Sequence, residues 1–391
     1  MNKQQEHPKV VEGIHYKTGK HTTITINKGK IADIQLTNSD HMDECIPWIG
    51  PGLIDLQING YNGNDFNTLP LSIESIQRVV RGLWSEGVTS FYPTVITNSD
   101  QEIEEALRTI AKACSEDQHL NNSIAGIHLE GPFLSPEDGP RGAHQIEYIK
   151  SPDWTLLQRW QEAAGGRIKI LTLSPEWPKS EVFIQKCTDS GVTVSIGHTS
   201  ASIEQIDKAV EAGARMSTHL GNGAHLMMRR HPNYIWEQLA QDDLWTCMIA
   251  DGFHLPRSVL KVMLKTKGEK AMLVSDAVFL SGLEPGEYTT HIGGEVVLTK
   301  EGKLHLKENS DLLAGSAQML TWGIEHIVRS DVCSFPDAWE MASTRPATFM
   351  ELPTKDGLKI GEQADLVLFE KDNGLQIRQT IKHGNVVYER S

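Results

Sequence analysis

The chain has 391 residues, of which 39% are hydrophobic and 23% are charged, and its formal net charge is −14. This composition is that of a folded protein long enough for one large domain and one small one. So acidic a chain argues against nucleic-acid binding through a general positive field, and an anionic ligand would need local cations.

Cysteine usage and the lack of targeting segments point to one compartment. The five cysteines are widely spaced and form no C-x-x-C motif: Cys45, Cys114, Cys187, Cys247 and Cys333. This pattern favours reduced thiols over a disulfide framework or a structural zinc. The N-terminal residues lack the apolar stretch of a signal peptide, and no run approaches the roughly 18 apolar residues of a membrane span. We therefore expect a cytoplasmic protein that does not contact a membrane.

Both ends of the chain contain short, alternating, strand-like segments around turn residues. These segments are residues 22–27, 30–36, 364–370 and 379–389. Terminal segments of one character can pair with each other. Residues 1–50 and 351–391 therefore predict a small β-sandwich domain built from both chain termini.

Residues 51–350 alternate between strand-like and helix-like segments. The eight strand candidates, in order, are GLIDLQING, VTSFYPTV, IAGIHLEG, IKILTLSPE, VTVSIGHT, RMSTHLGN, WTCMIADG and AMLVSDA. Helical stretches such as SIESIQRVVRGLWSEG separate most of them, and their final glycine is typical of a helix C-terminus. Eight such units predict a (β/α)8 TIM barrel. A doubly wound open sheet is the alternative, but no Gly-rich dinucleotide-binding motif supports it.

The segment IAGIHLEGPF, residues 124–133, carries the clearest chemical signal. Strand alternation puts His128 and Glu130 on one face, and a TIM barrel places its chemistry at strand ends. Two later strands end in His198 and His219. One carboxylate and two imidazoles suit zinc or a similar divalent ion with a position left open for water. Ordinary hydrogen-bonded roles would explain any one of the three more easily than all three together.

Asp276 follows the eighth apolar run, where a metal hydrolase would use it to move a proton between water and a leaving amine. Its alternative role is that of a turn aspartate. Gln57 and Asn59 share a face of the first strand. Amides are poor zinc ligands, so these two either orient water or a ligand, or have no function.

Loop residues supply further candidates. His144 follows the third strand closely, where it could polarise a carbonyl or hold a sugar hydroxyl. A cationic set in this acidic protein comprises Arg229, Arg230, His231 and His254. Such residues on barrel loops suit a phosphate group, although Arg229 is expected to be a solvated charge. His225 could ligate, bind substrate or merely fill its loop.

Nearly the whole chain resembles the amidohydrolase superfamily and, within it, the N-acetylglucosamine-6-phosphate deacetylases. The segments that carry the resemblance are PGLIDLQING, HLEGPF, GAH, GHT, THL-x-N, ADGFH, SDA, LLAGS and GLKIGEQADLVLF. The resemblance implies that Glu130, His198 and His219 bind one divalent metal per subunit, with zinc as the default. It also implies that Asp276 acts as general base and acid.

The resemblance further implies a small-molecule substrate, an N-acetylated amino sugar phosphate. Ala143 and His144 would contact the sugar, with His144 near the acetyl carbonyl, and Leu313 would line the pocket.

Four residues would hold the sugar phosphate: Asn222, Gly223, Arg230 and His254. In the family this arginine comes from the neighbouring subunit, which implies a homodimer.

Two departures from the family pattern bear on substrate and metal. Most of the superfamily has H-x-H on the first strand, whereas this chain has Gln57-Ile58-Asn59, which favours a single metal. After THL the family usually has an aromatic residue and Asn-Ala-Met, but residues 221–225 here read GNGAH. The altered 221–231 loop keeps open a deacetylase of another N-acyl amino sugar, either the galactosamine isomer or an unphosphorylated sugar.

Two more distant alternatives fit less well. A cyclic-amide hydrolase would want H-x-H and a lysine at the end of the fourth strand, and the sequence offers neither. A non-catalytic sugar-phosphate binding protein would not need a metal set together with a general base.

Overall fold

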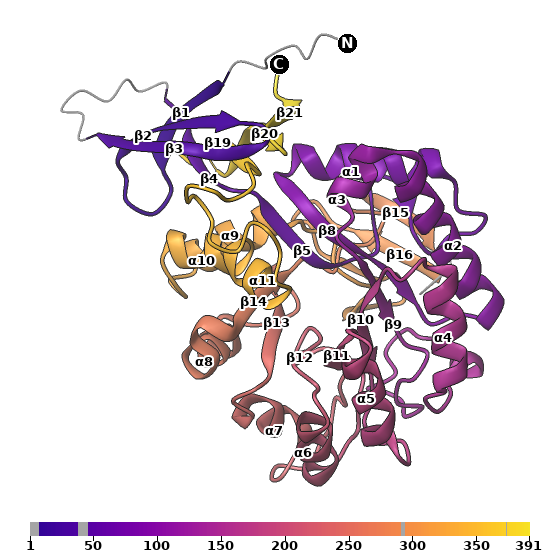
Figure 1. Cartoon of the computed structure of the whole chain (residues 1–391). Helices are drawn as coiled ribbons and strands as arrows, with labels where there is room; N and C mark the ends of the chain where they lie inside the picture. The colour runs from indigo at the N-terminus through magenta and orange to yellow at the C-terminus, as the bar shows by residue number, and fades with distance from the viewer. Residues whose placement is uncertain (1–7, 38–45, 291–293, 373) are drawn as a thin grey trace.

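The computed structural model describes residues 8–37, 46–290, 294–372 and 374–391 (Figure 1). Its centre is the expected barrel, with eight parallel strands in the order β14-β13-β12-β11-β10-β9-β8-β5. The strands are β5 (Leu53–Ile58), β8 (Val88–Ile96), β9 (Ile127–Glu130), β10 (Ile168–Leu173), β11 (Thr193–Ile196), β12 (Met216–Ser217), β13 (Trp245–Ile249) and β14 (Ala271–Val274). Each matches one of the eight predicted runs, and only β8 extends past its run, by one residue. Consecutive strands are neighbours throughout, which confirms the barrel over a doubly wound sheet.

The barrel closes between its first and last strands without a regular ladder. Ile58 and Ala277 form an isolated parallel bridge. The N–H of Asp276 donates to the carbonyl of Gln57 at 2.9 Å, and the N–H of Asn59 donates to the carbonyl of Ala277 at 2.8 Å. Loop residues just beyond β14 therefore complete this seam.

Helices pack around the outside of the barrel (Figure 1). They are α1 (Ile73–Ser85), α2 (Asp100–Glu116), α3 (Gln118–Ser123), α4 (Trp154–Ala163), α5 (Ser180–Asp189), α6 (Ile203–Glu211), α7 (Tyr234–Ala240), α8 (Arg257–Lys267), α9 (Leu320–Arg329), α10 (Phe335–Met341) and α11 (Thr344–Phe349), with short 3₁₀ turns η1 (Ile146–Tyr148) and η2 (Gly268–Lys270). Helix α1 illustrates how the local sequence sets where a helix begins and ends. The Ser72 hydroxyl accepts from the N–H of Ser75 and caps the start. Gly87, just past the C-cap, has φ +76, as a chain reversal into β8 requires.

Segments from both ends of the chain form one seven-stranded mixed sheet, in the order β21-β20-β19-β4-β1-β2-β3. Its strands are β1 (Lys9–His15), β2 (His21–Asn27), β3 (Lys30–Thr37), β4 (Trp48–Pro51), β19 (Leu366–Glu370), β20 (Gln376–Lys382) and β21 (Asn385–Glu389). The two ends meet where β4 pairs with β19, and Ile24, Ile49 and Leu366 share its buried core. The domain boundaries placed at residues 50 and 351 stay a prediction.

A four-stranded antiparallel sheet between β14 and α9 was not foreseen. It comprises β15 (Gly286–Thr290), β16 (Gly294–Leu298), β17 (Leu304–Leu306) and β18 (Asn309–Leu313), while β6 (Gly60–Tyr61) and β7 (Asn64–Asp65) form a small separate hairpin. Val296, Leu298 and Leu304 bury its inner face against Leu280. The sheet is thus an insertion with a small core of its own, placed directly after a strand that leads to the candidate site.

Four of the five cysteines are free thiols: Cys114, Cys187 and Cys247 are buried and Cys333 is partly buried. Cys45 lies outside the described residues. Burial raises the pKa of Cys187 to about 12, which makes it a poor nucleophile. Across the described ranges, no helix combines the length and apolarity needed to cross a bilayer.

Candidate active site

The predicted site residues gather at the carboxyl ends of the barrel strands. Glu130 is the last residue of β9, whereas His198, His219 and Asp276 each lie two residues beyond the ends of β11, β12 and β14. The last three have positive φ angles of +49°, +24° and +47°. Residues other than glycine rarely adopt this region, and such strain collects at functional sites.

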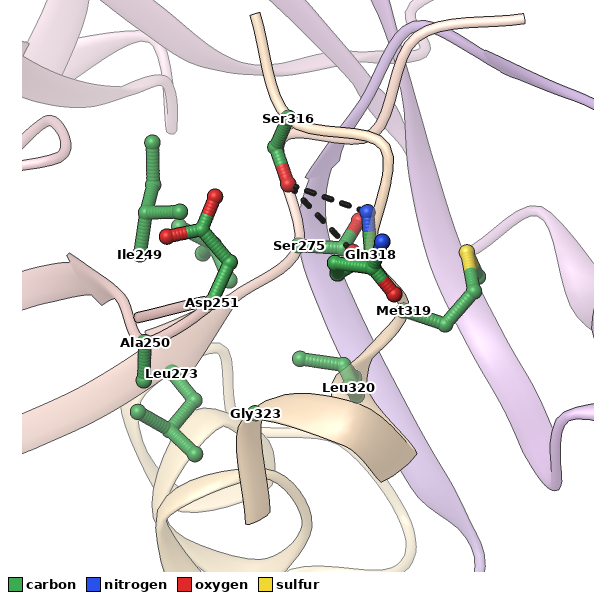
Figure 2. Close-up of a pocket in the computed structure, with 11 residues that line it drawn as sticks. Ile249, Ala250, Asp251, Leu273, Ser275, Ser316, Gln318, Met319, Leu320 and Gly323 are labelled. Atoms are coloured by element: carbon green, nitrogen blue, oxygen red, sulfur yellow. Dashed lines mark hydrogen bonds between the residues drawn. The ribbon is translucent and has the colours of Figure 1, made fainter. Parts of the chain in front are cut away.

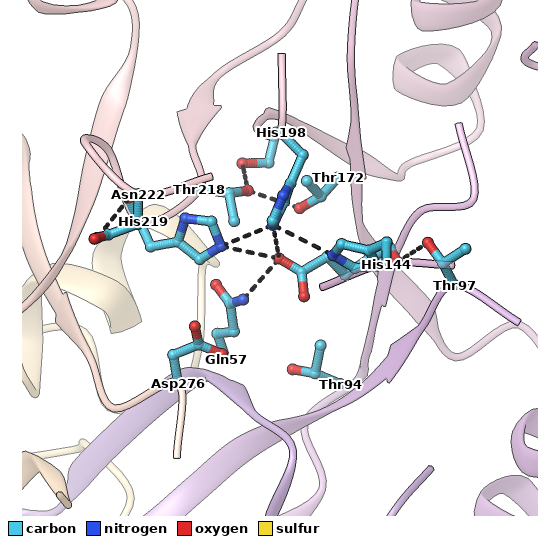
Figure 3. A network of polar contacts seen from close by, with 12 residues as sticks. Gln57, Thr94, Thr97, His144, Thr172, His198, Thr218, His219, Asn222 and Asp276 are labelled. Carbon is cyan, nitrogen blue, oxygen red and sulfur yellow. Dashed lines mark hydrogen bonds and ion pairs between the residues drawn. The ribbon is translucent and has the colours of Figure 1, made fainter. Parts of the chain in front are cut away.

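Glu130, His198, His219 and His144 form one buried polar cluster (Figure 3). Glu130 Oε1 lies 3.1 Å from His219 Nε2 and 3.3 Å from His198 Nε2. The two imidazole nitrogens are 3.2 Å apart, and His144 Nε2 lies 3.4 Å from His198 Nε2. Potential ligand atoms of Glu130, His144 and His198 all lie within 4.8 Å of one another. The structure therefore brings the three predicted ligands together and adds His144 to them.

The donor set fits a divalent cation. His198 Nδ1 donates to the carbonyl of Pro140 at 2.8 Å, so in the neutral ring the lone pair sits on Nε2 and faces Glu130. Two imidazoles and a carboxylate converging in this way match a zinc-type set with an open position. Fixing one ring nitrogen through a carbonyl is also how proteins orient metal-binding histidines.

The protonation states of Glu130 and His144 suit metal binding as well. Burial disfavours ionised Glu130, but hydrogen bonds to His198 and His219 outweigh it and hold the pKa of Glu130 well below its usual range. Burial and the neighbouring His198 lower the pKa of His144 to about 3. Near neutral pH the carboxylate is therefore ionised and His144 is neutral, as ligation requires.

Asp276, Gln57 and Asn59 lie at the edge of the cluster (Figure 3 labels the first two). Asn59 Nδ2 donates to Asp276 Oδ1 at 2.8 Å, and Gln57 Nε2 donates to Glu130 Oε1 at 2.9 Å. Burial raises the pKa of Asp276 to about 6, a value suited to a general base that works near neutrality. Both amides thus touch a site carboxylate, which strand-end amides without function would not need to do.

His128 lies two residues before Glu130 on β9, and both of its ring nitrogens are hydrogen-bonded. Its Nδ1 donates to the carbonyl of Leu56 at 3.0 Å, and its Nε2 accepts from the Thr172 hydroxyl at 2.7 Å. Burial lowers the pKa of His128 to about 4. Hydroxyl contacts continue from Thr172 to Thr218 at 2.7 Å and from Thr218 to Ser195 at 2.5 Å. Sequence analysis missed these hydroxyls, because threonine and serine are unremarkable in strands.

His254 is held by an aspartate that the sequence analysis did not single out. His254 Nδ1 donates to Asp251 Oδ2 at 2.6 Å, and Asp251 Oδ1 accepts from the N–H groups of Phe253 and His254. Burial opposes ionisation of Asp251, but the bond from His254 outweighs it and lowers the pKa of Asp251. With Nδ1 engaged, His254 Nε2 is the ring atom left for a ligand. The available signal was a carboxylate three residues before a histidine at a strand end.

Residues 221–233, which extend the 221–231 loop by two residues, contact the site only near Asn222 and Gly223. Asn222 donates from Nδ2 to the His219 carbonyl at 3.1 Å, and a Cβ on Gly223 would lie 2.6 Å from His198 Nδ1. Arg230, by contrast, is exposed and has no ion pair within the described part of the chain. The loop therefore approaches the cluster at Gly223, whereas Arg230 lies outside it.

Three other predicted or open residues are accounted for as follows. His225 Nε2 contacts Glu137 Oε2 at 3.0 Å and its Nδ1 contacts the Tyr234 hydroxyl at 3.0 Å, which joins this loop to the one after β9. Ala143 is exposed beside buried His144, and Leu313 is half-buried at the end of β18. None of these positions by itself identifies a ligand contact.

Two cavities differ in what they could hold. The one in Figure 2 measures about 10 Å³ and is lined by Asp251, Ser275, Ser316 and Gln318 among others. That is room for about one water molecule and not for a sugar. A groove of about 410 Å³ lies between residues 200–204 and the 221–233 loop. Of these two, the groove has the dimensions of a small-molecule site, but none of Glu130, His198, His219 or Asp276 lines it.

Comparison with known proteins identifies the family. A model of the amidohydrolase family matches residues 48–387. The chain belongs to this family.

Within it, the chain belongs with the N-acetylglucosamine-6-phosphate deacetylases. It is 35% identical over 342 residues to that enzyme of Bacillus subtilis (strain 168), covering 86% of this chain and 84% of the relative. It is 31% identical over 351 residues to that of Homo sapiens, covering 87% and 83%. The crystal structure of N-acetylglucosamine-6-phosphate deacetylase from Thermotoga maritima superposes with a TM-score of 0.83 at 27% identity, covering 98% of this chain and all of that one.

Proposed function

We propose that the protein hydrolyses N-acetylglucosamine 6-phosphate to glucosamine 6-phosphate and acetate in amino sugar catabolism. The observation that carries the proposal is the buried convergence of Glu130, His198 and His219, with Asp276 beside them, in a chain of this family. We place the reaction in the cytoplasm, where free thiols such as those of the four described cysteines persist.

Glu130, His198 and His219 would hold one divalent ion, and we propose zinc. His144 lies close enough to join them, but its proposed role is toward the substrate. When bound, the ion polarises the amide carbonyl and lowers the pKa of water at the site. Gln57 would add no ligand, because amides are poor zinc ligands, and its Nε2 donates to Glu130 instead.

Asp276 would take a proton from the attacking water and later deliver it to the departing amine. Asn59 orients the Asp276 carboxylate through the 2.8 Å bond. His144 is neutral at working pH, and its Nδ1 is buried without a partner among the described residues. A neutral imidazole can donate to the acetyl carbonyl oxygen as negative charge develops there.

Asn222, Gly223, Arg230 and His254 would bind the 6-phosphate, with Ala143 and Leu313 against the sugar. Arg230 does not reach the cluster within one chain, so we propose that a partner subunit receives it in a homodimer. Next to it Leu226 and Met227 are 86% and 90% exposed, an apolar surface that a second copy would cover.

The test is acetate release from N-acetylglucosamine 6-phosphate, from its galactosamine isomer and from unphosphorylated N-acetylglucosamine, by protein of known metal content. Fast turnover of the first alone would support the reaction, the sugar and the phosphate site. A preference for either of the others would assign the altered 221–231 loop to a different N-acyl amino sugar. Failure on all three, with about one metal per chain, would contradict the proposed substrate.

A further inference from the structure

The barrel seam contains a buried carboxylate that none of the proposed steps uses. Asp55 lies in β5 and is completely buried. Its Oδ1 accepts two backbone N–H groups, from Gln57 at 3.2 Å and from Ser275 at 3.2 Å. Its Oδ2 is buried with no hydrogen-bond partner among the described residues. One oxygen therefore joins the first strand of the barrel to the segment that follows the last.

These two contacts lead directly to both halves of the candidate site. Gln57, whose N–H Asp55 binds, donates from its side chain to Glu130 Oε1 at 2.9 Å. Ser275, the second donor, immediately precedes Asp276, and the N–H of Asp276 donates to the Gln57 carbonyl at 2.9 Å. Asp55 is thus linked to the base through Ser275, its neighbour in sequence, and to Glu130 through two hydrogen bonds that Gln57 makes.

A carboxylate is a costly way to close a barrel. Burial raises the pKa of Asp55 to about 7, which shows how strongly this site disfavours its charge. Backbone pairing closes other strand junctions of this barrel without any side chain. At this junction β5 and β14 do not pair as a ladder, and Asp276 takes a left-handed φ of +47°. Only a few backbone bonds hold the Ser275–Asp276 segment here, and Asp55 adds a side-chain restraint to them.

We infer that Asp55 is a positioning residue, which sets Asp276 against the Glu130 cluster by holding Gln57 and Ser275 with a single oxygen. The inference rests on the proposed function for its kinetic consequence, but its structural consequence extends to metal binding. Because Gln57 restrains Glu130, loosening the seam would also loosen a proposed metal ligand.

The experiment compares Asp55→Ala, Asp55→Asn and a matched control in metal-loaded protein. Asparagine keeps an oxygen that can accept both N–H groups, whereas alanine keeps none. The control is Ile24→Ala, which truncates a fully buried side chain in the terminal sheet and leaves the seam untouched. Three quantities are measured: kcat and KM for acetate release, zinc affinity by competition with a chromophoric chelator, and the thermal midpoint.

Asp55→Ala should lower kcat about 100-fold with KM little changed, since small misplacements of a reacting group cost about this much. Its zinc affinity should fall about 10-fold, as is usual when support for a ligand is lost. Asp55→Asn should stay within a few-fold of wild type in both, and Ile24→Ala should lose only stability. If Asp55→Ala does not fold, Asp55→Ser, whose hydroxyl is too short to reach both groups, gives the same comparison.

Unchanged kcat and zinc affinity in the alanine variant would overturn the inference, as would losses matched by Ile24→Ala. Failure of both deletion variants to fold, with Asp55→Asn fully active, would assign Asp55 to folding alone and also overturn it. The two proposals separate cleanly. An inactive wild type whose zinc affinity still depends on Asp55 would refute only the substrate, and an active wild type indifferent to Asp55→Ala would refute only the positioning role.

Discussion

Asp276→Asn should lower kcat strongly while leaving the rest of the site in place. Asparagine has nearly the same shape, and its oxygen can still accept from Asn59 Nδ2, which now donates at 2.8 Å. What the change removes is the ability to take up and return a proton. General acid–base groups contribute about 10²- to 10⁴-fold, and this is the loss in kcat that we expect. At 1.36 kcal/mol per factor of ten, the barrier rises by about 3–5 kcal/mol.

The pH profile of the wild type gives the same assignment independently. Burial raises the pKa of Asp276 to about 6, and the working form of a base is the ionised one. The rate constant kcat/KM should therefore fall as pH drops through that value and stay flat above it. A cation bound by Glu130 and the imidazoles favours the carboxylate, so the acid limb of the loaded enzyme lies at or below about pH 6.

Asn59→Ala is the matched control. It removes the bond that stabilises and orients ionised Asp276, so the acid limb should move to higher pH. The rate above it should fall less than in Asp276→Asn, because the proton acceptor remains. Initial rates of acetate release across pH, with metal content measured in each sample, check both variants. Asp276→Asn with more than a tenth of wild-type kcat, or a wild-type acid limb above pH 7, would refute the assignment of Asp276 as the base.

Three further predictions concern the phosphate site, the metal and the buried ion pair between Lys382 and Asp365. Arg230→Ala should raise KM for the phosphorylated sugar about 10-fold or more, since a charge-assisted bond to phosphate is lost, and leave KM for the unphosphorylated sugar unchanged. Arg229→Ala is the control. Equal effects of Arg230→Ala on both sugars would contradict the phosphate assignment. Dialysis against a chelator should abolish acetate release, and stoichiometric zinc should restore it; activity that survives verified metal loss would exclude the metal mechanism. Lys382→Met leaves Asp365 without its ion-pair partner, now 2.6 Å away, in a place where both side chains are buried. The free energy of unfolding in urea should fall by about 3–5 kcal/mol. A fall below about 1 kcal/mol would show that the pair is not effectively buried.

The barrel was predictable because its strands are buried on both faces. Such strands read as short apolar runs, and all eight runs became barrel strands. The inserted sheet of β15–β18 gives no such signal. β18 has four exposed residues of five, and β15 alternates only between exposed and half-buried positions. A strand that buries so little is indistinguishable in sequence from a polar loop.

Some residues of the candidate site could likewise be predicted from the sequence and others could not. Glu130, His198 and Asp276 could be predicted because chemically distinctive residues stood at the ends of recognisable strands. Asp55 could not, because its partners are backbone groups, which no residue type signals, and Asp251 had only its spacing from His254 as a signal. Arg230 stays a prediction, because it is exposed within one chain and its proposed role depends on a second subunit.

Strict strand alternation would have placed two of the predicted ligands wrongly. Ser195 and Met216 face the barrel interior, so period-two geometry sends His198 and His219 outward, away from Glu130. Both nevertheless point inward, within 3.3 Å of Glu130.

The positive φ angles of His198 and His219 account for the difference, because a left-handed residue just past the strand end breaks the alternation and redirects the side chain. The cost of that conformation must be met locally. For His198, the bond to the Pro140 carbonyl and the close approach of Gly142 and Gly223 supply the restraint, since a Cβ at either glycine would come within 3.2 Å of the ring. The two glycines are therefore part of the site, and the loops that carry them cannot be exchanged for bulkier ones without displacing a proposed ligand.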